Sequence, residues 1–290
     1  MDGQAARKGR DVMKTGKLVL TIAVSVAFLV LSAVLSQGIV MSLLAMAGVP
    51  AWLYHIVGGL LYAVSAYIMV RLFCTKFLKT GMEAFLIPKC RIQIRWAVAA
   101  VLLPVLVSAV YLFLPGHFAS DTLDAGTKAA FVTRGVFLAG LGAGFVEELL
   151  FRGLLMNAVI KKFGMAVGIC APSVLFASLH IIGMNFSLLS CVQVMIAGTM
   201  AGVMFSLIAL EGGSIWNSAV VHALWNMIMI GGGMTIGTEP DGYAICSYVL
   251  DTRSFLLTGG EFGIESSVVS IIGYLVVGMA AVSALRRKNK

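Results

Sequence analysis

Apolar residues in this 290-residue chain are gathered into runs of about 20, and these runs constrain the fold more than any other feature. A helix of about 20 apolar residues spans the hydrocarbon core of a bilayer and satisfies its own backbone hydrogen bonds there. Because 60% of the residues are hydrophobic and only 12% are charged, the sequence predicts an all-α, polytopic membrane protein forming one domain over residues 1–290. The eight predicted transmembrane helices cover roughly residues 18–46, 51–70, 96–114, 136–159, 165–182, 188–210, 215–230 and 268–285.

The basic residues predict the orientation of these helices. Eighteen of the 21 Lys and Arg residues fall in segments 7–17, 71–95, 152–162 and 286–290, which eight spans place on one side. Lys-rich and Arg-rich short loops stay on the cytoplasmic side, so both termini are predicted to be cytoplasmic. The net charge of +8 then indicates contact with anionic membrane lipids and not with nucleic acid, because it is divided among membrane-flanking loops.

The first apolar run and the cysteines carry less information. The run has nearly 30 residues, about twice the length of a signal-peptide core, so it is predicted to remain as an uncleaved anchor. The five cysteines form no CxxC pair, which argues against a disulfide framework and a thiolate metal site.

Two adjacent glutamates, Glu147 and Glu148, lie inside the fourth apolar run, with Arg152 one turn later. A carboxylate at membrane depth is costly unless it faces a protein interior or a wet cavity and finds a partner, so this pair marks a candidate functional site. Glu148 and Arg152 are four residues apart and are predicted to form a salt bridge. Glu147 is then left free, about 100° away around an α-helix.

Other polar side chains recur at helical spacing within the apolar runs. Phe176 and His180 are four residues apart in the fifth predicted span, and His222 and Asn226 are four apart in the seventh, so each pair lies on one helix face. If the fourth and fifth spans form a hairpin, Glu147 and His180 both lie about 24 Å from the turn. They can therefore face each other across one cavity, with Phe176 as a wall that contacts substrate.

Two imidazoles, a carboxylate and an amide suit hydrolysis of a peptide carbonyl, by either of two routes. His180 and His222 with one glutamate are candidate Zn²⁺ ligands that would leave a position open for water. Alternatively, Glu147 accepts the proton of water as a general base and Asn226 donates to the developing oxyanion, with the histidines orienting water. The residues alone do not choose between the two routes. Asn226 is the obvious second-shell acceptor for a histidine.

Three motifs resemble those of the CPBP family, the CAAX proteases and bacteriocin-processing (Abi) membrane proteases. Glu147 to Arg152 (EELLFR) resembles its EExxxR motif, Phe176 to His180 (FASLH) resembles FxxxH, and His222 to Asn226 (HALWN) resembles HxxxN. The motifs occur in the family's order, and the resemblance covers about residues 136–230.

The resemblance implies an eight-span helical fold and an intramembrane endopeptidase that cleaves a membrane-associated peptide, of lipidated CAAX-like or bacteriocin-like type. It makes Glu147 the water-activating residue, His180, His222 and Asn226 its partners, and Glu148 with Arg152 the supporting pair. The cofactor stays open, with Zn²⁺ as a candidate, and so does the oligomeric state. The alternative is a non-enzymatic membrane protein, either a transporter that uses the acidic pair or a bacteriocin immunity factor.

Overall fold

The computed structural model describes residues 13–288, and within this part of the chain six helices are long and apolar enough to cross a membrane. These six extend over Thr15–Met46, Ala51–Leu78, Ile94–Leu112, Ala125–Phe163, Leu188–Gly212 and Val268–Lys288. The α-helical segments within them are α1 (Thr15–Ala33), α2 (Met41–Met46), α3 (Ala51–Leu72), α4 (Ile94–Leu112), α5 (Ala125–Thr133), α6 (Phe145–Glu147), α7 (Met156–Phe163), α9 (Leu188–Gly212) and α12 (Val268–Lys288). The chain is therefore a mostly helical, multi-pass membrane protein, as the apolar runs predict.

The prediction of eight spans is corrected to about six, because the fifth and seventh predicted spans are short helices. These are α8 (Met165–Leu179) and α10 (Ile215–Met229), each of 15 residues. At 1.5 Å per residue each is about 22 Å long, less than the hydrocarbon core. The apolar sequence continues past α8 as Ile181 and Ile182, but the chain turns there and Gly183 takes a positive φ of 80°.

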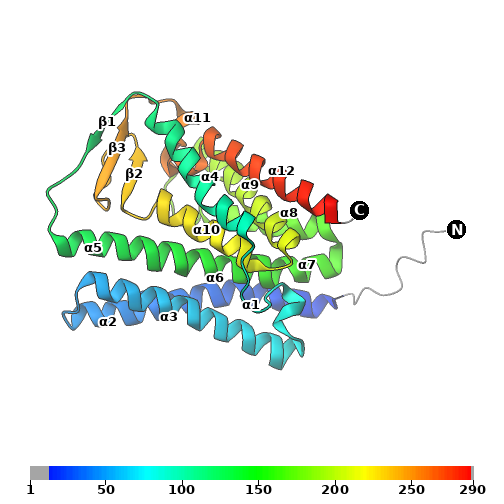
Figure 1. Cartoon of the computed structure of the whole chain (residues 1–290). Helices are drawn as coiled ribbons and strands as arrows, with labels where there is room; N and C mark the ends of the chain where they lie inside the picture. The colour runs from blue at the N-terminus through cyan, green and yellow to red at the C-terminus, as the bar shows by residue number, and fades with distance from the viewer. Residues whose placement is uncertain (1–12, 289–290) are drawn as a thin grey trace.

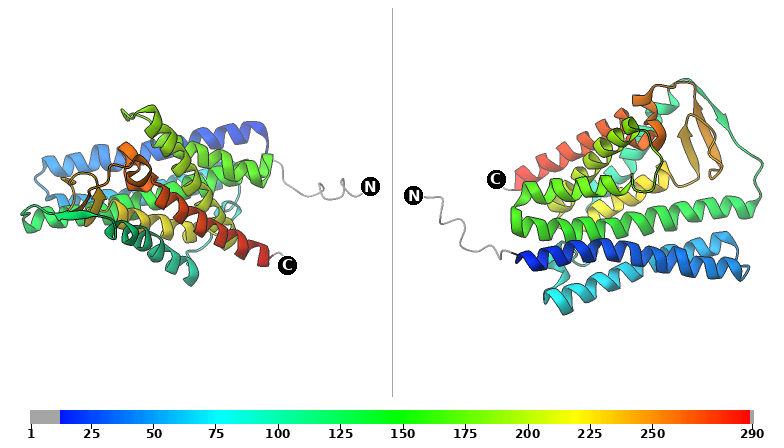
Figure 2. Two further views of the ribbon diagram at one scale, coloured as in Figure 1. Left: turned by 90° about the horizontal axis from the view of Figure 1, so that it is seen from above. Right: turned by 180° about the vertical axis from the view of Figure 1, so that it is seen from behind.

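The continuous helix from α5 to α7 lies at the centre of the bundle (Figure 1). The α1–α3 hairpin packs on one side of it, and α8 and α10 pack on the other, with α4, α9 and α12 beyond. The described ends of α1 and α12 lie at the same end of the molecule in both further views (Figure 2). There, Lys162 Nζ donates to the Thr15 hydroxyl at 3.1 Å, and Lys288 pairs with Glu211 at 2.7 Å. Arg7, Lys8 and Arg10, which the orientation prediction also used, lie outside the described residues.

A small β-sheet caps the opposite end of the bundle, and the all-α prediction did not include it (Figure 1). Its strands are β1 (Gly116–Ala119), β2 (Met234–Gly237) and β3 (Cys246–Leu250), in the order β1-β3-β2. β3 pairs antiparallel with β1 and parallel with β2. The segment from 231 to 267 holds β2, β3 and α11 (Phe255–Thr258), although its glycines and Pro240 are typical of a loop.

Glycines allow the helices that carry the polar residues to approach closely. A Cβ at Gly202 on α9 would lie 2.7 Å from Ser173 Cβ on α8, and one at Gly144 would lie 2.9 Å from the Ala223 backbone on α10. The small-xxx-small spacings at Gly140 and Gly144 and at Gly198 and Gly202 thus pack helices within this chain.

We expect Gly202→Ala to destabilise the protein by about 1–3 kcal/mol, because the new methyl group forces α8 and α9 apart. Gly38→Ala is the matched control in a membrane helix, since its Cβ would meet only Val34 at 3.8 Å. The measurement is the thermal unfolding midpoint of both purified variants. A Gly202→Ala midpoint equal to that of Gly38→Ala would contradict the close-packing argument.

Candidate active site

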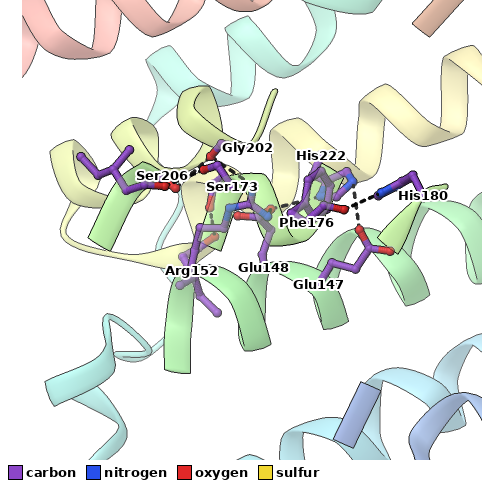
Figure 3. Close-up of polar contacts among 12 residues, drawn as sticks. Glu147, Glu148, Arg152, Ser173, Phe176, His180, Gly202, Ser206 and His222 are labelled. Carbon is purple, nitrogen blue, oxygen red and sulfur yellow. Dashed lines mark hydrogen bonds and ion pairs between the residues drawn. The ribbon is translucent and has the colours of Figure 1, made fainter. Parts of the chain in front are cut away.

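The predicted site residues come from three neighbouring helical segments (Figure 3). Glu147 ends α6, and Glu148 begins a π-helical turn over Glu148–Leu155 that also holds Arg152. Phe176 lies near the end of α8 and His180 caps it, while α10 carries His222 and Asn226. π-helical turns inside α-helices occur frequently at functional sites.

Glu148 and Arg152 form a fully buried salt bridge. Arg152 Nη1 lies 3.0 Å from Glu148 Oε1, and the exposed fractions of the two side chains are 1% and 0%. Arg152 Nη2 donates to the Gly202 carbonyl at 3.1 Å, and its guanidinium centre lies 4.5 Å from the Phe176 ring centroid. The close approach of α9 at Gly202 therefore supplies a hydrogen-bond acceptor for this buried cation.

His222 lies between the two glutamates, which the sequence did not predict. Its Nδ1 is 3.1 Å from Glu148 Oε1, the same oxygen that faces Arg152, and its Nε2 is 3.7 Å from Glu147 Oε2. The Phe205 ring stacks on the imidazole at a centroid distance of 4.5 Å. Glu148 is therefore more than the partner of Arg152, because its carboxylate also orients His222.

His180 is oriented by a backbone carbonyl. Its Nδ1 lies 2.8 Å from the Phe176 carbonyl oxygen, which can only accept, so Nδ1 carries the hydrogen. In the neutral ring Nε2 then keeps its lone pair. The prediction of Asn226 as the acceptor for a histidine is wrong: Glu148 and the Phe176 carbonyl hold the two rings, and Asn226 Nδ2 donates to the Ala139 carbonyl at 2.9 Å.

Two cavities share lining residues, among them His180 and Phe176. The outer cavity, of about 360 Å³, is lined by Glu147, Tyr62 and Phe262 besides these two residues. The inner cavity, of about 60 Å³, is lined by His180, Phe176, His222 and Asn226 and by residues of α9. Phe176 thus lies on the wall of both cavities.

Two polar residues that line these cavities were missed in the sequence. Tyr62 lies within an apolar run of α3, where a tyrosine gives no signal of its own. Glu265 lines the inner cavity from the segment before α12, and it looked like one of several scattered acids in a loop. A glutamate closely followed by an apolar run is the only sequence signal that could have singled out Glu265.

The described side chains do not fit the candidate zinc site. Among residues 13–288, no group of three or more His, Cys, Asp or Glu side chains is arranged to hold a metal ion. His222 already has a carboxylate near each ring nitrogen. His180 and His222 each bond through Nδ1 to a protein oxygen.

The fold and the site together define a class: a multi-pass membrane protein with a buried glutamate–histidine cluster that opens to a cavity. A family model described as type II CAAX prenyl endopeptidase, Rce1-like, matches residues 129–228. This segment is a domain of that family, a family of CAAX-type endopeptidases, and the resemblance of the three motifs to CPBP proteases is confirmed. Neither a curated protein nor a solved structure matches the chain.

Proposed function

We propose that the protein is an intramembrane endopeptidase that cleaves a membrane-associated peptide, of lipidated CAAX-like or bacteriocin-like type, with Glu147 activating water. The observation that carries the proposal is the placement of Glu147 at the outer cavity, with Oε2 free of any hydrogen-bond partner among the described residues and 3.7 Å from His222 Nε2. That distance is too long for a direct hydrogen bond, and the Glu147 side chain keeps an exposed fraction of 19%, through which a water in the cavity can reach the carboxylate.

Each neighbouring residue has a role in this proposal. Glu147 takes a proton from water, the resulting hydroxide attacks the peptide carbonyl carbon, and Glu147 passes the proton to the amine nitrogen as the C–N bond breaks. His180 Nε2 accepts a hydrogen bond from the other O–H of the water and so orients the water. Asn226 has one N–H bound to Ala139 and a second that can donate to the carbonyl oxygen as it becomes negative.

The proposed orientation places the described ends of α1 and α12, and with them both termini, on the cytoplasmic side. The basic residues Lys162 and Lys288 at this end of the bundle support it. Membrane lipid surrounds the helices, and the peptide substrate enters through the outer cavity.

The test is incubation of the purified protein, in liposomes, with membrane-anchored peptides, followed by mass spectrometry of the products. We expect one new amine and one new carboxylate terminus per cleaved peptide. Proton or solute flux through the same liposomes, with every peptide left intact, would instead support the transporter alternative and contradict the proposal.

Chelation tests the role of a metal. Because the described residues do not form a three-ligand site, we expect less than stoichiometric zinc by elemental analysis and little change in cleavage after chelator treatment. Stoichiometric zinc whose removal abolishes cleavage, and whose return restores it, would show that His180 and His222 are ligands.

A further inference from the structure

Glu265 is a third carboxylate at the site, and it lies outside the segment that matches the family. Its Oε1 accepts a hydrogen bond from Trp225 Nε1 at 2.8 Å, and its backbone carbonyl accepts one from the Tyr274 hydroxyl at 3.0 Å. Trp225 immediately precedes Asn226 on α10. The hydrogen bond therefore ties Glu265 directly to the helix that carries His222. Its carboxylate therefore has a fixed place beside the catalytic groups.

The loop that carries Glu265 is anchored from several directions. The Ser266 carbonyl accepts from Gln193 Nε2 at 3.0 Å, and the Tyr111 hydroxyl donates to the Leu257 carbonyl at 2.7 Å. The Ser187 backbone N–H donates to Glu261 Oε2 at 2.6 Å, which joins this loop to the one that follows His180. The anchors hold the loop over the site, and a fixed wall is what selective binding needs.

The inner cavity combines apolar walls with this carboxylate. Val194, Ala197, Ala201 and Phe205 give it an apolar lining, and its volume of about 60 Å³ suits a slender chain better than a ring. Its polar groups include His180, His222, Asn226 and Glu265. A substrate side chain in this cavity would thus meet both apolar walls and a carboxylate.

Glu265 has no cationic partner in the described part of the chain. No Lys or Arg forms an ion pair with it, and the Trp225 indole is the one donor to its carboxylate. Arg152, the cation of the site, is already paired with Glu148 and Gly202. Burial raises the pKa of the Glu265 carboxyl, and a cation beside it would lower that pKa again. An unpaired carboxylate in a narrow cavity therefore complements a positively charged group.

We propose that Glu265 and the inner cavity form a substrate subsite that receives a lysine side chain next to the cleaved bond. The four-carbon stem lies along the apolar walls, and the ammonium group pairs with the Glu265 carboxylate. This inference rests on the proposed peptidase function and assigns it a preference for an alkylammonium side chain.

The experiment compares membrane-anchored peptides that differ at one residue flanking the cleaved bond: lysine, or norleucine, which has the same stem without the charge. In the wild type we expect lysine to raise kcat/KM at least about tenfold over norleucine, the effect of a modest desolvated ion pair. Glu265→Gln keeps an acceptor for Trp225 and should bring the ratio close to one. Glu239→Gln, at an exposed glutamate outside both cavities, should leave the ratio unchanged. Because the ratio is taken on one sample, a partly unfolded variant does not distort it.

Binding of the same two peptides to Glu147→Gln protein separates the two proposals. A lysine preference in binding that Glu265→Gln removes, without cleavage of any peptide by the wild type, would support the subsite and overturn the peptidase. Cleavage with equal rates for the two peptides, or with a lysine preference that survives in Glu265→Gln, would overturn the subsite and leave the peptidase intact.

Discussion

Glu147→Gln is expected to lower the rate of peptide cleavage by about a thousandfold, within the range for removal of a general base. Glutamine keeps the volume of the side chain but cannot take a proton from water. The unfolding midpoint should remain close to the wild-type value, because Glu147 Oε2 has no hydrogen-bond partner to lose among the described residues and its contact with His222 is 3.7 Å. Cleavage rates and thermal unfolding of the same purified sample check both statements.

Glu239→Gln is the matched control for this result. It makes the same chemical change at an exposed carboxylate that lines neither cavity. We expect it to cleave at the wild-type rate. Wild-type turnover by well-folded Glu147→Gln protein would contradict the assignment of Glu147 as the base.

The candidate site was largely visible in the sequence because its residues are polar and lie in apolar runs. Glu148 and Arg152 are four residues apart, so their salt bridge follows from helix geometry, and its length of 3.0 Å confirms that prediction. The contact between Glu148 and His222 joins residues 74 positions apart, and only the packing of α10 against the central helix creates it. No local spacing in the sequence encodes such a contact.

Helix length and type were the harder part to predict. Hydropathy reports how apolar a segment is and not where its helix ends, so α8 and α10 were predicted as full spans although each has 15 residues. The π-helical turn that begins at Glu148 also alters the directions expected from a regular α-helix. Glu147 and Glu148 approach different nitrogens of one imidazole, a contact that the sequence did not predict.

Glu148→Gln is expected to lose both stability and activity, for two separable reasons. It leaves the buried Arg152 guanidinium without its carboxylate, a change that costs about 3–5 kcal/mol when one partner of a buried ion pair is removed. It also replaces the charged acceptor at His222 Nδ1 with a neutral amide, which holds the ring less strongly. The single variant alone cannot divide its activity loss between these causes.

The double variant Glu148→Gln/Arg152→Met divides them. Methionine removes the unpaired cation while keeping apolar contact with Phe176 and Phe205, which now enclose the guanidinium. We expect the double variant to recover most of the lost unfolding free energy, since replacing a buried ion pair by well-packed uncharged groups is often close to neutral. Its cleavage rate should stay at least about tenfold below wild type, because His222 still lacks a charged acceptor.

Unfolding midpoints and cleavage rates of the wild type, Glu148→Gln, Arg152→Met and the double variant form one thermodynamic cycle. Recovery of activity together with stability in the double variant would show that Glu148 acts only by neutralising Arg152. A Glu148→Gln protein that loses activity at unchanged thermal stability would show the reverse. Glu148 would then take part in the reaction directly, and its salt bridge with Arg152 would not explain the loss of activity.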